Sequence, residues 1–410
     1  MAWRVLGGSA GSRSLGSMRA VTVEERRARL GRRHALAGGA QAATPVAAAA
    51  RVVALHGTDA ASVFLSALAR MRDGDVAAVE RALYEERSLL RVLAMRRTMF
   101  VAPVDTAAVM LAACSRDVAA RERRRLIGFL EAAAIGGRDV DGWLAGAEQA
   151  TLEALAARGE ATAPELAGED QRLATTLVLG AGSKYEAKVT VASRVLIVLG
   201  AQGRVIRTRP TGSWTSTQFR WAALSAWHPG VAEQSGDDAR VELARRWLAA
   251  FGPATPDDLR WWAGWTAGQT RDALAGVETV DVGLDRATGV LLAGDEEPVQ
   301  AGEPWATLLP ALDPTVMGWK ERSWYLGPHR ELLFDRNGNA APTVWWDGRV
   351  VGGWAQAQGG EIRTHLLEDV GRDGEAAIEL EAAALAARVG AATLSPRARA
   401  RAPLEQQLLR

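Results

Sequence analysis

Three polar side chains interrupt an otherwise apolar stretch near the N-terminus, in the segment VVALHGTDAASVFLSALARM (52–71). His56, Thr58 and Asp59 lie at the seam between two apolar runs of helical spacing. A histidine can orient or deprotonate a water molecule near neutral pH, and a threonine hydroxyl can hold that water by a hydrogen bond. Thr and Asp are also preferred N-cap residues of helices. The pattern therefore allows either a catalytic site or a capped helix junction.

Composition limits the classes of protein to which the chain could belong. Its 410 residues exceed one ordinary core, so two to four domains of about 100–150 residues are expected. No run of roughly 18 uncharged apolar residues is present, so no membrane span is expected. The single cysteine, Cys114, and five scattered histidines lack the spacing of a disulfide framework or a metal site. We expect no metal and no cofactor.

The N-terminal segment has no long apolar region of the kind that a secretion signal needs, which predicts a cytoplasmic protein. Thr22 and Glu25 form a capping-box pattern just after Met18. We therefore expect the first helix to begin near residue 22. Residues 1–20 are expected to be a disordered extension, and residues 1–17 allow an upstream start as an alternative.

Positive charge is concentrated in a few segments, although the net charge is only +1. Residues 1–33 carry a net charge of +6, and residues 184–220 carry the same. The tail adds Arg397, Arg399 and Arg401, while 294–298 and 368–381 are acidic. This distribution is typical of a face that binds double-stranded DNA. The alternative is that these arginines are ordinary solvated side chains.

An internal repeat suggests how the chain is organised. LAARGEATAPEL (155–166) and LAAFGPATPDDL (248–259) match at seven of twelve positions with an offset of 93 residues. In each copy a helix is expected to end at a glycine C-cap, Gly159 or Gly252, and a short second helix to begin at a threonine N-cap, Thr162 or Thr255. The repeat therefore predicts a helix, a tight turn and a second helix.

The segments after each copy complete the unit. TAGQTRDALAGV is expected to be a third helix, followed by the strands TVDVGLD and GVLLA. After the first copy come the helix VASRVLIVLGAQG and the strands RVIRTRP and SWTSTQFRWA. Three helices followed by a β-hairpin are typical of a winged helix. Residues 22–36, 45–55, 59–71 and 75–87 should be helical, and 89–103 a hairpin turning near 95–97, which gives an earlier unit of the same kind.

The C-terminal third changes character. It is rich in Trp, Val and Gly, with turn dipeptides at 337–338 and 347–348, and it should be β-rich over about 303–370. A helix at 375–389 and a short basic strand or tail are expected to follow. We predict an α+β protein of tandem winged-helix units and a β-rich C-terminal domain, divided into an extension (1–20), unit 1 with the candidate site (21–140), unit 2 with a basic wing (141–230), unit 3 (231–302) and the C-terminal domain (303–410).

Several further residues could contact DNA or support a site. Arg96 and Arg97 would lie at a hairpin tip suited to phosphate or minor-groove contact, or in a solvated turn. The Trp pairs at 261–262 and 345–346 allow base stacking, but core packing is favoured because each pair must bury one ring. Asp313 could support the site, although turn capping is favoured. The other candidate DNA-binding residues are Lys184, Lys188, Arg204, Arg207, Arg209, Gln218 and Arg220.

The motifs LHGTDAASVFLSALAR, MRRTMFV, TQFRW, RWLAAFGPATPDDLRWWAGW, LLPALDPTVMGW and PTVWWDGRVVGGW resemble a known family. The family is the winged helix DNA-binding domain proteins that include the AlkZ-type, azinomycin-resistance DNA glycosylases. The resemblance extends from about Val21 to Leu408. It implies a monomer of three tandem winged helices and a β-domain that curves around DNA and excises bulky alkylated purines or unhooks crosslinks.

The resemblance also bears on the opening motif. Characterised members of the family carry Gln-x-Gln or Gln-x-Asp where this chain has His56-Gly57-Thr58, and the following Asp matches Asp59. The catalytic candidates are therefore His56, Thr58 and Asp59, with both Gln positions changed. The predicted function is a DNA glycosylase. The alternative is a non-catalytic winged-helix DNA-binding protein or transcriptional regulator, although no heptad or dimer helix is apparent.

Overall fold

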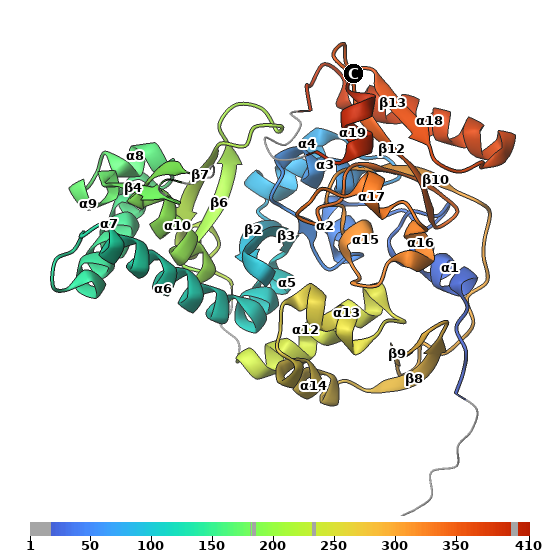
Figure 1. Cartoon of the computed structure of the whole chain (residues 1–410), viewed down its shortest axis with the longest axis horizontal. Helices are drawn as coiled ribbons and strands as arrows, with labels where there is room; N and C mark the ends of the chain where they lie inside the picture. The colour runs from blue at the N-terminus through green and yellow to red at the C-terminus, as the bar shows by residue number, and fades with distance from the viewer. Residues whose placement is uncertain (1–17, 181, 183–185, 232–234, 395–400) are drawn as a thin grey trace, which may run out of the picture.

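A three-stranded antiparallel sheet carries the His56 segment and lies near the middle of the molecule (Figure 1). The computed structural model describes residues 18–180, 182, 186–231, 235–394 and 401–410. Of the disordered extension expected over 1–20, residues 1–17 lie outside the described residues. The expectation was wrong for its end, because Ala20 forms a bridge with Gly283 and the Gly283 amide donates to the Arg19 carbonyl. The elements up to residue 132 are α1 (Val23–Arg33), α2 (Pro45–Ala50), β1 (Leu55–His56), α3 (Ala60–Leu68), α4 (Val76–Glu80), η1 (Arg81–Glu85), β2 (Leu89–Ala94), η2 (Met95–Arg97), β3 (Thr98–Pro103), α5 (Val104–Met110), η3 (Leu111–Ser115) and α6 (Arg116–Ala132).

The order of this sheet is β1-β3-β2, and its register fixes His56 opposite Phe100. The hairpin predicted over 89–103 is confirmed, because β2 and β3 pair along their whole length around the turn at Met95–Arg97. The helices expected at 22–36, 45–55 and 59–71 are confirmed as α1, α2 and α3, each shorter than predicted. The fourth divides into α4 and the π-helix η1.

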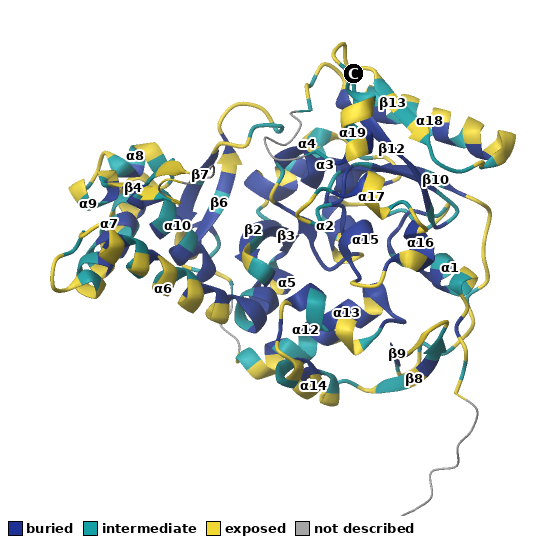
Figure 2. Cartoon of the chain, in the orientation of Figure 1, coloured by how far each residue is buried: buried dark blue, intermediate teal, exposed yellow. Residues whose placement is uncertain are grey.

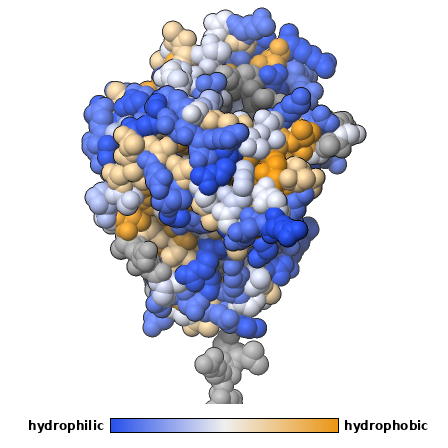
Figure 3. Space-filling model, turned by 90° about the vertical axis from the view of Figure 1, so that its left-hand side faces the viewer, coloured by the Kyte–Doolittle hydropathy of each residue, from blue (hydrophilic) through white to orange (hydrophobic). Residues whose placement is uncertain are grey.

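The next segment forms the left-hand part of Figure 1. Its elements are α7 (Val140–Arg158), α8 (Ala163–Ala167), α9 (Gln171–Ala174), β4 (Thr176–Leu179), β5 (Ala187–Thr190), α10 (Val191–Ala201), β6 (Val205–Pro210), β7 (Phe219–Ala223) and α11 (Leu224–Trp227). The hairpin of β4 and β5 was not expected from the sequence. Figure 3 shows the outer face of this part as largely hydrophilic, with scattered hydrophobic areas. Among the described residues of this segment, Val178 is the large hydrophobic side chain that is exposed.

The second repeat copy lies in the elements α12 (Gly236–Phe251), α13 (Pro256–Ala263), α14 (Ala267–Ala275), β8 (Thr279–Leu284) and β9 (Ala287–Leu292). Both predicted threonine caps are confirmed, since Thr162 and Thr255 each form a reciprocal capping box with the residue three positions on. Gly159 ends α7 in a positive-φ conformation (φ 75°), which suits glycine, whereas Gly252 ends α12 in an extended one. The helix and hairpin predicted after this copy are present.

The C-terminal part is built on a four-stranded antiparallel sheet of order β10-β11-β12-β13. Its elements are β10 (Ala306–Leu309), α15 (Pro314–Met317), α16 (Ser323–Leu326), α17 (Arg330–Leu333), β11 (Thr343–Trp346), β12 (Arg349–Gln356), β13 (Ile362–Leu366), α18 (Gly371–Val389) and α19 (Pro403–Leu408). Two expectations were wrong here. The segment 314–333 contains three short helices instead of strands, and the first begins there because Asp313 caps α15 and Pro314 occupies its first turn. The chain after residue 402 forms a helix instead of a strand or tail.

Burial separates two main hydrophobic cores (Figure 2). The larger core joins residues from predicted unit 1, predicted unit 3 and the C-terminal part, for example Leu55, Trp247 and Trp345. The second core, which includes Leu130 and Leu196, belongs to the segment from α6 to β7. The candidate site therefore rests on the core that segments far apart in the sequence share.

A buried hydrogen-bond network ties this larger core together. Arg70 and Asp313 form a fully buried ion pair with Nη2–Oδ1 at 2.7 Å. Arg70 also donates to the Thr315 hydroxyl at 2.7 Å, and that oxygen lies 2.8 Å from His34 Nδ1. The other ring nitrogen, Nε2, lies 3.2 Å from the Ala250 carbonyl. Each polar atom at these contacts has a partner, which is what burial of such groups requires. The favoured capping role of Asp313 is thus confirmed.

Candidate functional site

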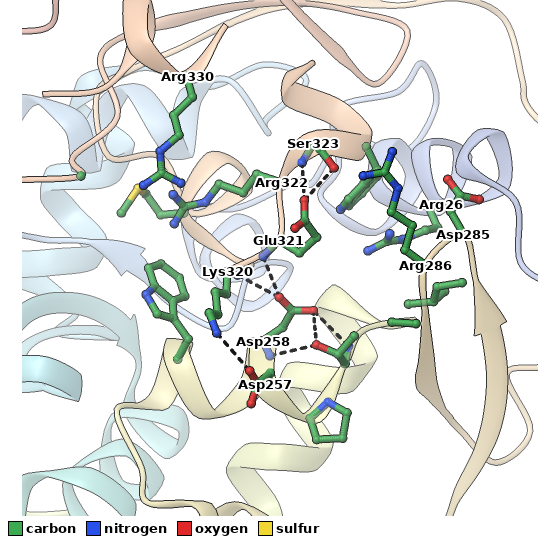
Figure 4. A pocket seen from close by; sticks show the side chains of 18 of the residues that line it. Arg26, Asp257, Asp258, Asp285, Arg286, Lys320, Glu321, Arg322, Ser323 and Arg330 are labelled. Atoms are coloured by element: carbon green, nitrogen blue, oxygen red, sulfur yellow. Dashed lines mark hydrogen bonds and ion pairs between the residues drawn. The ribbon is translucent and has the colours of Figure 1, made fainter. Parts of the chain in front are cut away.

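A cleft of about 1350 Å³ is the candidate site (Figure 4). Its walls come from α1, the β2–β3 turn, the start of α13, the β8–β9 turn and the segment from Met317 to Arg330. These elements are far apart in the sequence. The asparagine-glycine turn expected at 337–338 also lines the cleft, and Gly338 there has a positive φ of 77°.

His56 contributes to the wall of this cleft from the edge strand β1. Its side chain is 9% exposed, and its ring meets Phe100 edge-on with 5.6 Å between ring centroids. The next residue is held on both sides: the Gly57 amide donates to the Met99 carbonyl at 2.7 Å, and its carbonyl accepts from buried Arg91 at 2.9 Å. Backbone pairing and Arg91 therefore fix the direction of the imidazole toward the cleft.

Thr58 and Asp59 do not share this direction. Neither is among the described residues that line the cleft, and Thr58 is exposed. Asp59 is the N-cap of α3: its Oδ2 accepts from the Ser62 amide at 3.2 Å and from the Ser62 hydroxyl at 2.6 Å. It borders a small cavity of about 70 Å³ beside Trp354. Of the three polar residues in the opening motif, the structure brings only His56 to the cleft.

The cleft is predominantly basic. Seven basic and four acidic side chains line it among the described residues. The basic side chains are Arg26, Arg27, Arg96, Arg286, Lys320, Arg322 and Arg330, and the acidic ones are Asp257, Asp258, Asp285 and Glu321. A cleft lined by one dominant sign of charge raises the local concentration of ligands of the opposite sign. The arrangement suits a polyanion.

Three of the four acids are already engaged by the protein (Figure 4). Asp258 is buried and accepts from the backbone amides of Lys320 and Glu321 at 2.9 Å each. Hydrogen bonds from Ser323 lower the pKa of Glu321, and the hydrogen bond from Lys320 lowers the pKa of Asp257. Glu321 and Asp257 are therefore ionised at neutral pH, and together with Asp258 they fix the loop that carries Arg322.

Two arginines of α1 reach the cleft from the opposite wall. Arg26 is 8% exposed and stacks on Trp324, with Cζ 4.1 Å from the ring centroid. Burial lowers its pKa to about 10, although Asp258 partly offsets that effect, so the guanidinium remains charged. Arg27 donates to the Trp324 carbonyl at 2.6 Å and 3.0 Å. The basic N-terminal segment thus supplies part of the site.

Other arginines of α1 have acidic partners instead. Arg29 and Arg33 both form ion pairs with Asp295, which belongs to the acidic stretch noted in the sequence. That stretch therefore neutralises part of α1.

The two arginines at the hairpin tip have different surroundings. Arg96, with φ 52°, lies over Trp261 in the cleft, with 4.2 Å from Cζ to the ring centroid. Arg97 is exposed and forms an ion pair with Glu122 at 2.6 Å. Both positive φ values are unusual for arginine and show that the turn is tight.

A basic patch missed in the sequence lies beside this hairpin tip. Burial lowers the pKa of Arg194 on α10, and the charges of Arg97 on η2 and Arg125 on α6 lower it further, while Glu122, the partner of Arg97, raises it. The helix α6 packs against both α10 and η2. We call Arg97, Arg125 and Arg194 the hairpin patch. The run RERRR at 121–125 was a signal for it, because clustered arginines on one helix are typical of nucleic-acid contact.

The predicted basic wing, β6–β7, is less exposed than expected. Arg207 is packed against Phe219 and Trp221, at 5.4 Å and 4.9 Å from the ring centroids, and burial lowers its pKa to about 10. Arg209 is exposed but stacks on Tyr84 at 4.6 Å. Arg204 is exposed and borders a separate cavity of about 880 Å³. The expectation of three arginines alternating on a free hairpin was wrong for Arg207, because aromatic rings cover it.

The remaining candidates are scattered. Lys188 is exposed on β5, and Lys184 lies outside the described residues. Gln218 is exposed just before β7. Arg220 forms ion pairs with Glu160 at 3.6 Å and Glu165 at 3.3 Å. None of these four is among the described residues of the cleft.

The core packing that was favoured for the two tryptophan pairs is confirmed, because one ring of each pair is buried. Trp262 is 4% exposed and Trp345 is fully buried, whereas their neighbours are partly exposed. Trp261, however, lines the cleft and contacts the guanidiniums of Arg96 and Arg322. Two weak sequence signals indicate this cluster: the double tryptophan at 261–262 and the basic motif WKER at 319–322.

The described residues were also searched for membrane-spanning helices and for groups of metal-binding side chains. No described helix is long and apolar enough to cross a membrane. Within the same described ranges, no group of three or more histidine, cysteine or acidic side chains could hold a metal ion.

The chain is similar to known proteins in both fold and sequence. The chain has the fold of a solved DNA glycosylase: Streptomyces sahachiroi DNA glycosylase AlkZ matches with a TM-score of 0.70 at 20% sequence identity, over 90% of this chain and 96% of that chain. Residues 49–388 also match the model of the family described as DNA glycosylase AlkZ-like. The chain therefore belongs to the AlkZ-like DNA glycosylase family. A search of the curated proteins finds no match.

The resemblance predicted from the sequence motifs is confirmed by this membership. The family and the fold support a role as a DNA glycosylase with DNA as its substrate, and they do not favour a non-catalytic regulator.

Proposed function

We propose that this chain excises alkylated or bulky purine adducts from double-stranded DNA, including the unhooking of crosslinks, with His56 at the reaction centre. The observation that carries the proposal is the position of His56: it lines the basic cleft and occupies the first polar position of the family motif. A cleft of about 1350 Å³ is large enough for a flipped nucleotide with an adduct.

Excision of a cationic alkylated purine requires the protein mainly to position a water molecule. An N7- or N3-alkylated purine is already cationic and leaves without being protonated, so the site must place a water near C1′ and tolerate a cationic sugar. His56 orients or deprotonates that water. The carboxylate of Glu321, whose pKa is lowered by hydrogen bonds from Ser323, favours the positive charge that develops on the sugar. Thr58 would act only if the segment moved, and Asp59 acts by capping α3.

The DNA path is part of the proposal. A duplex would lie over the cleft and the hairpin patch, with Arg96 and Arg97 at the junction between them. The exposed side chains of Lys188, Arg204 and Arg209 would contact phosphates farther along. Such contacts give affinity with little sequence preference.

The architecture supports this path. Each repeat copy continues into a helix and an antiparallel hairpin, the plan of a winged helix. We propose three such units acting as a monomer, in the cytoplasmic compartment where DNA is found.

The direct test measures base release. Duplexes with a single N7-methylguanine, or a single bulkier N3-adenine adduct, would be incubated with the whole chain, and abasic sites converted to strand breaks for gel analysis. Release from the modified duplex, with none from the unmodified duplex, is expected. Tight binding without release from either adduct would contradict excision and leave a non-catalytic DNA-binding protein.

A further inference from the structure

Trp261 holds two arginines from distant parts of the chain. It lies in α13, Arg96 belongs to the β2–β3 turn, and Arg322 immediately precedes α16. The two Cζ atoms lie 4.2 Å and 4.7 Å from the ring centroid. The Arg322 guanidinium also lies 5.1 Å from the ring of Phe334. Aromatic faces hold both guanidinium planes in a fixed orientation without neutralising their charge.

These guanidiniums lack an acidic partner. Among the described residues, neither Arg96 nor Arg322 forms an ion pair with a carboxylate, whereas Arg97, Arg220 and Arg246 each do. Arg96 Nε is buried and has no hydrogen-bond partner. Arg322 Nε donates to the Trp319 carbonyl at 2.8 Å, while its buried Nη2 makes no hydrogen bond of normal geometry. Burial lowers the pKa of Arg322, whereas the Tyr325 hydroxyl and, to a smaller extent, the charge of Asp258 raise it.

A third cation reaches the same place. Figure 4 shows the guanidinium ends of Arg322 and Arg330 directed toward the same part of the cleft. Burial lowers the pKa of Arg322, and the positive charge of Arg330 also lowers it. Burial lowers the pKa of Arg96 to about 10, with Arg322 as the second cause. Desolvated like charges destabilise the protein unless an anion lies between them. Three converging guanidiniums therefore point to an anionic ligand.

The geometry selects the kind of anion. A guanidinium presents parallel N–H donors that fit the two free oxygens of a phosphodiester, which carries one negative charge. His56 lines the same cleft, so an anion held by these arginines shares the cleft with the proposed reaction centre. Every nucleotide of the target strand carries such a group next to its sugar. Fixing one phosphodiester would therefore fix the C1′ atom relative to His56.

We infer that Arg96, Arg322 and Arg330 form a clamp for one phosphodiester of the DNA strand that carries the adduct, with Trp261 holding the guanidinium planes of Arg96 and Arg322. This inference rests on the proposed function, because the clamp acts on the nucleotide that is to be excised. The three arginines are positioning residues. They differ from the hairpin patch, whose contacts would be spread along the duplex and interchangeable between phosphates.

Neutral phosphate analogues test the clamp one phosphate at a time. A series of duplexes would each contain a stable abasic-site analogue and one methylphosphonate, moved through the positions that flank the lesion. Binding to the whole chain would be measured at fixed salt. For the wild-type chain, one position should weaken binding by about tenfold or more, while neighbouring substitutions should cost about twofold.

The matched variant is Arg330→Gln, because Arg330 is exposed and its substitution leaves the core intact. In this variant, the methylphosphonate at the sensitive position should weaken binding much less than it does for the wild-type chain. The reason is that the arginine that would contact the phosphate charge is already absent. Arg322→Gln should show the same coupling if it folds. Arg286→Ala, an exposed arginine elsewhere in the cleft, is the control and should weaken binding to all duplexes without changing the position of the sensitive phosphate.

The outcomes separate the two proposals. A uniform effect at every phosphate, or an unchanged sensitive position in Arg330→Gln, would overturn the clamp and leave the glycosylase function standing. The binding measurement does not depend on excision, so coupling in a chain that releases no base would support the clamp alone. No binding to any duplex would overturn both.

Discussion

His56 and Asp59, three residues apart, face different cavities: the imidazole lines the large basic cleft, while the carboxylate caps α3 beside Trp354. The short strand β1 ends between them, so the chain changes direction at Gly57 and Thr58. The two side chains therefore have different roles: His56 contributes to the cleft, and Asp59 stabilises the start of α3. Their effects can be separated by substitution.

The first prediction concerns His56. His56→Ala should reduce excision of a cationic alkylpurine to background and leave the affinity for duplex DNA nearly unchanged, because a group that positions water acts on the transition state rather than on the bound ground state. His56→Gln keeps a polar side chain of the type that the family uses, and it should retain part of the rate. Single-turnover release and duplex binding would be measured together.

Thr58→Ala is the matched control for His56, since Thr58 is exposed and does not line the cleft. It should lower the rate by no more than about tenfold. Excision at the wild-type rate by His56→Ala would contradict the proposed reaction centre.

The second prediction concerns the cap at Asp59. Asp59→Ala should lower the free energy of unfolding by about 1 kcal/mol, whereas Asp59→Asn should cost less because the amide oxygen can still accept from Ser62. Excision by the folded protein should change little in either variant. Denaturant unfolding and the release assay would be compared.

Asp75→Ala provides a matched cap far from the chemistry, because Asp75 caps α4 through the Ala78 amide at 2.7 Å. Both alanine variants should lose similar stability. Lost excision in Asp59→Asn, without lost stability, would instead give Asp59 a direct part in the reaction.

The third prediction follows from the buried imidazole of His34. Burial, and after it the positive charge of nearby Arg70, lower its pKa from the ordinary value of 6.5 to about 3. Between those two values the unfolded chain binds a proton that the folded chain does not. Stability should therefore fall as the pH falls from 6.5 toward 3, by up to about 1.4 kcal/mol per pH unit for this group.

His34→Gln isolates that contribution, because an amide side chain is polar but does not titrate. Melting temperatures would be compared at pH 7.5 and pH 5, where most carboxylates stay ionised in both states. At pH 7.5 the melting temperature of the variant should be lower than that of the wild-type chain, because the substitution disturbs the hydrogen bonds to Thr315 and Ala250. Between pH 7.5 and pH 5, however, the melting temperature of the variant should fall less. An equal loss in both proteins would show that His34 contributes nothing to the pH dependence.

The sequence by itself determined the local elements of this protein. The threonine caps at 162 and 255, the repeat that contains them and the hairpin turning at Arg96 and Arg97 all depend on residues within a few positions of one another. Capping and strand pairing around a tight turn are interactions of that range, so spacing alone predicts them. The family motifs extended this reading to the function.

Only the tertiary structure decided which side chains face the cleft. Arg96, Trp261 and Arg322 are separated by more than sixty positions at the closest, and no spacing rule relates them. The direction of His56 depends on pairing with β3, and the covering of Arg207 depends on aromatic rings of another strand. Such contacts arise when distant segments pack on a shared core. Local sequence cannot specify them, because burial and charge pairing are set by the neighbours that packing brings together.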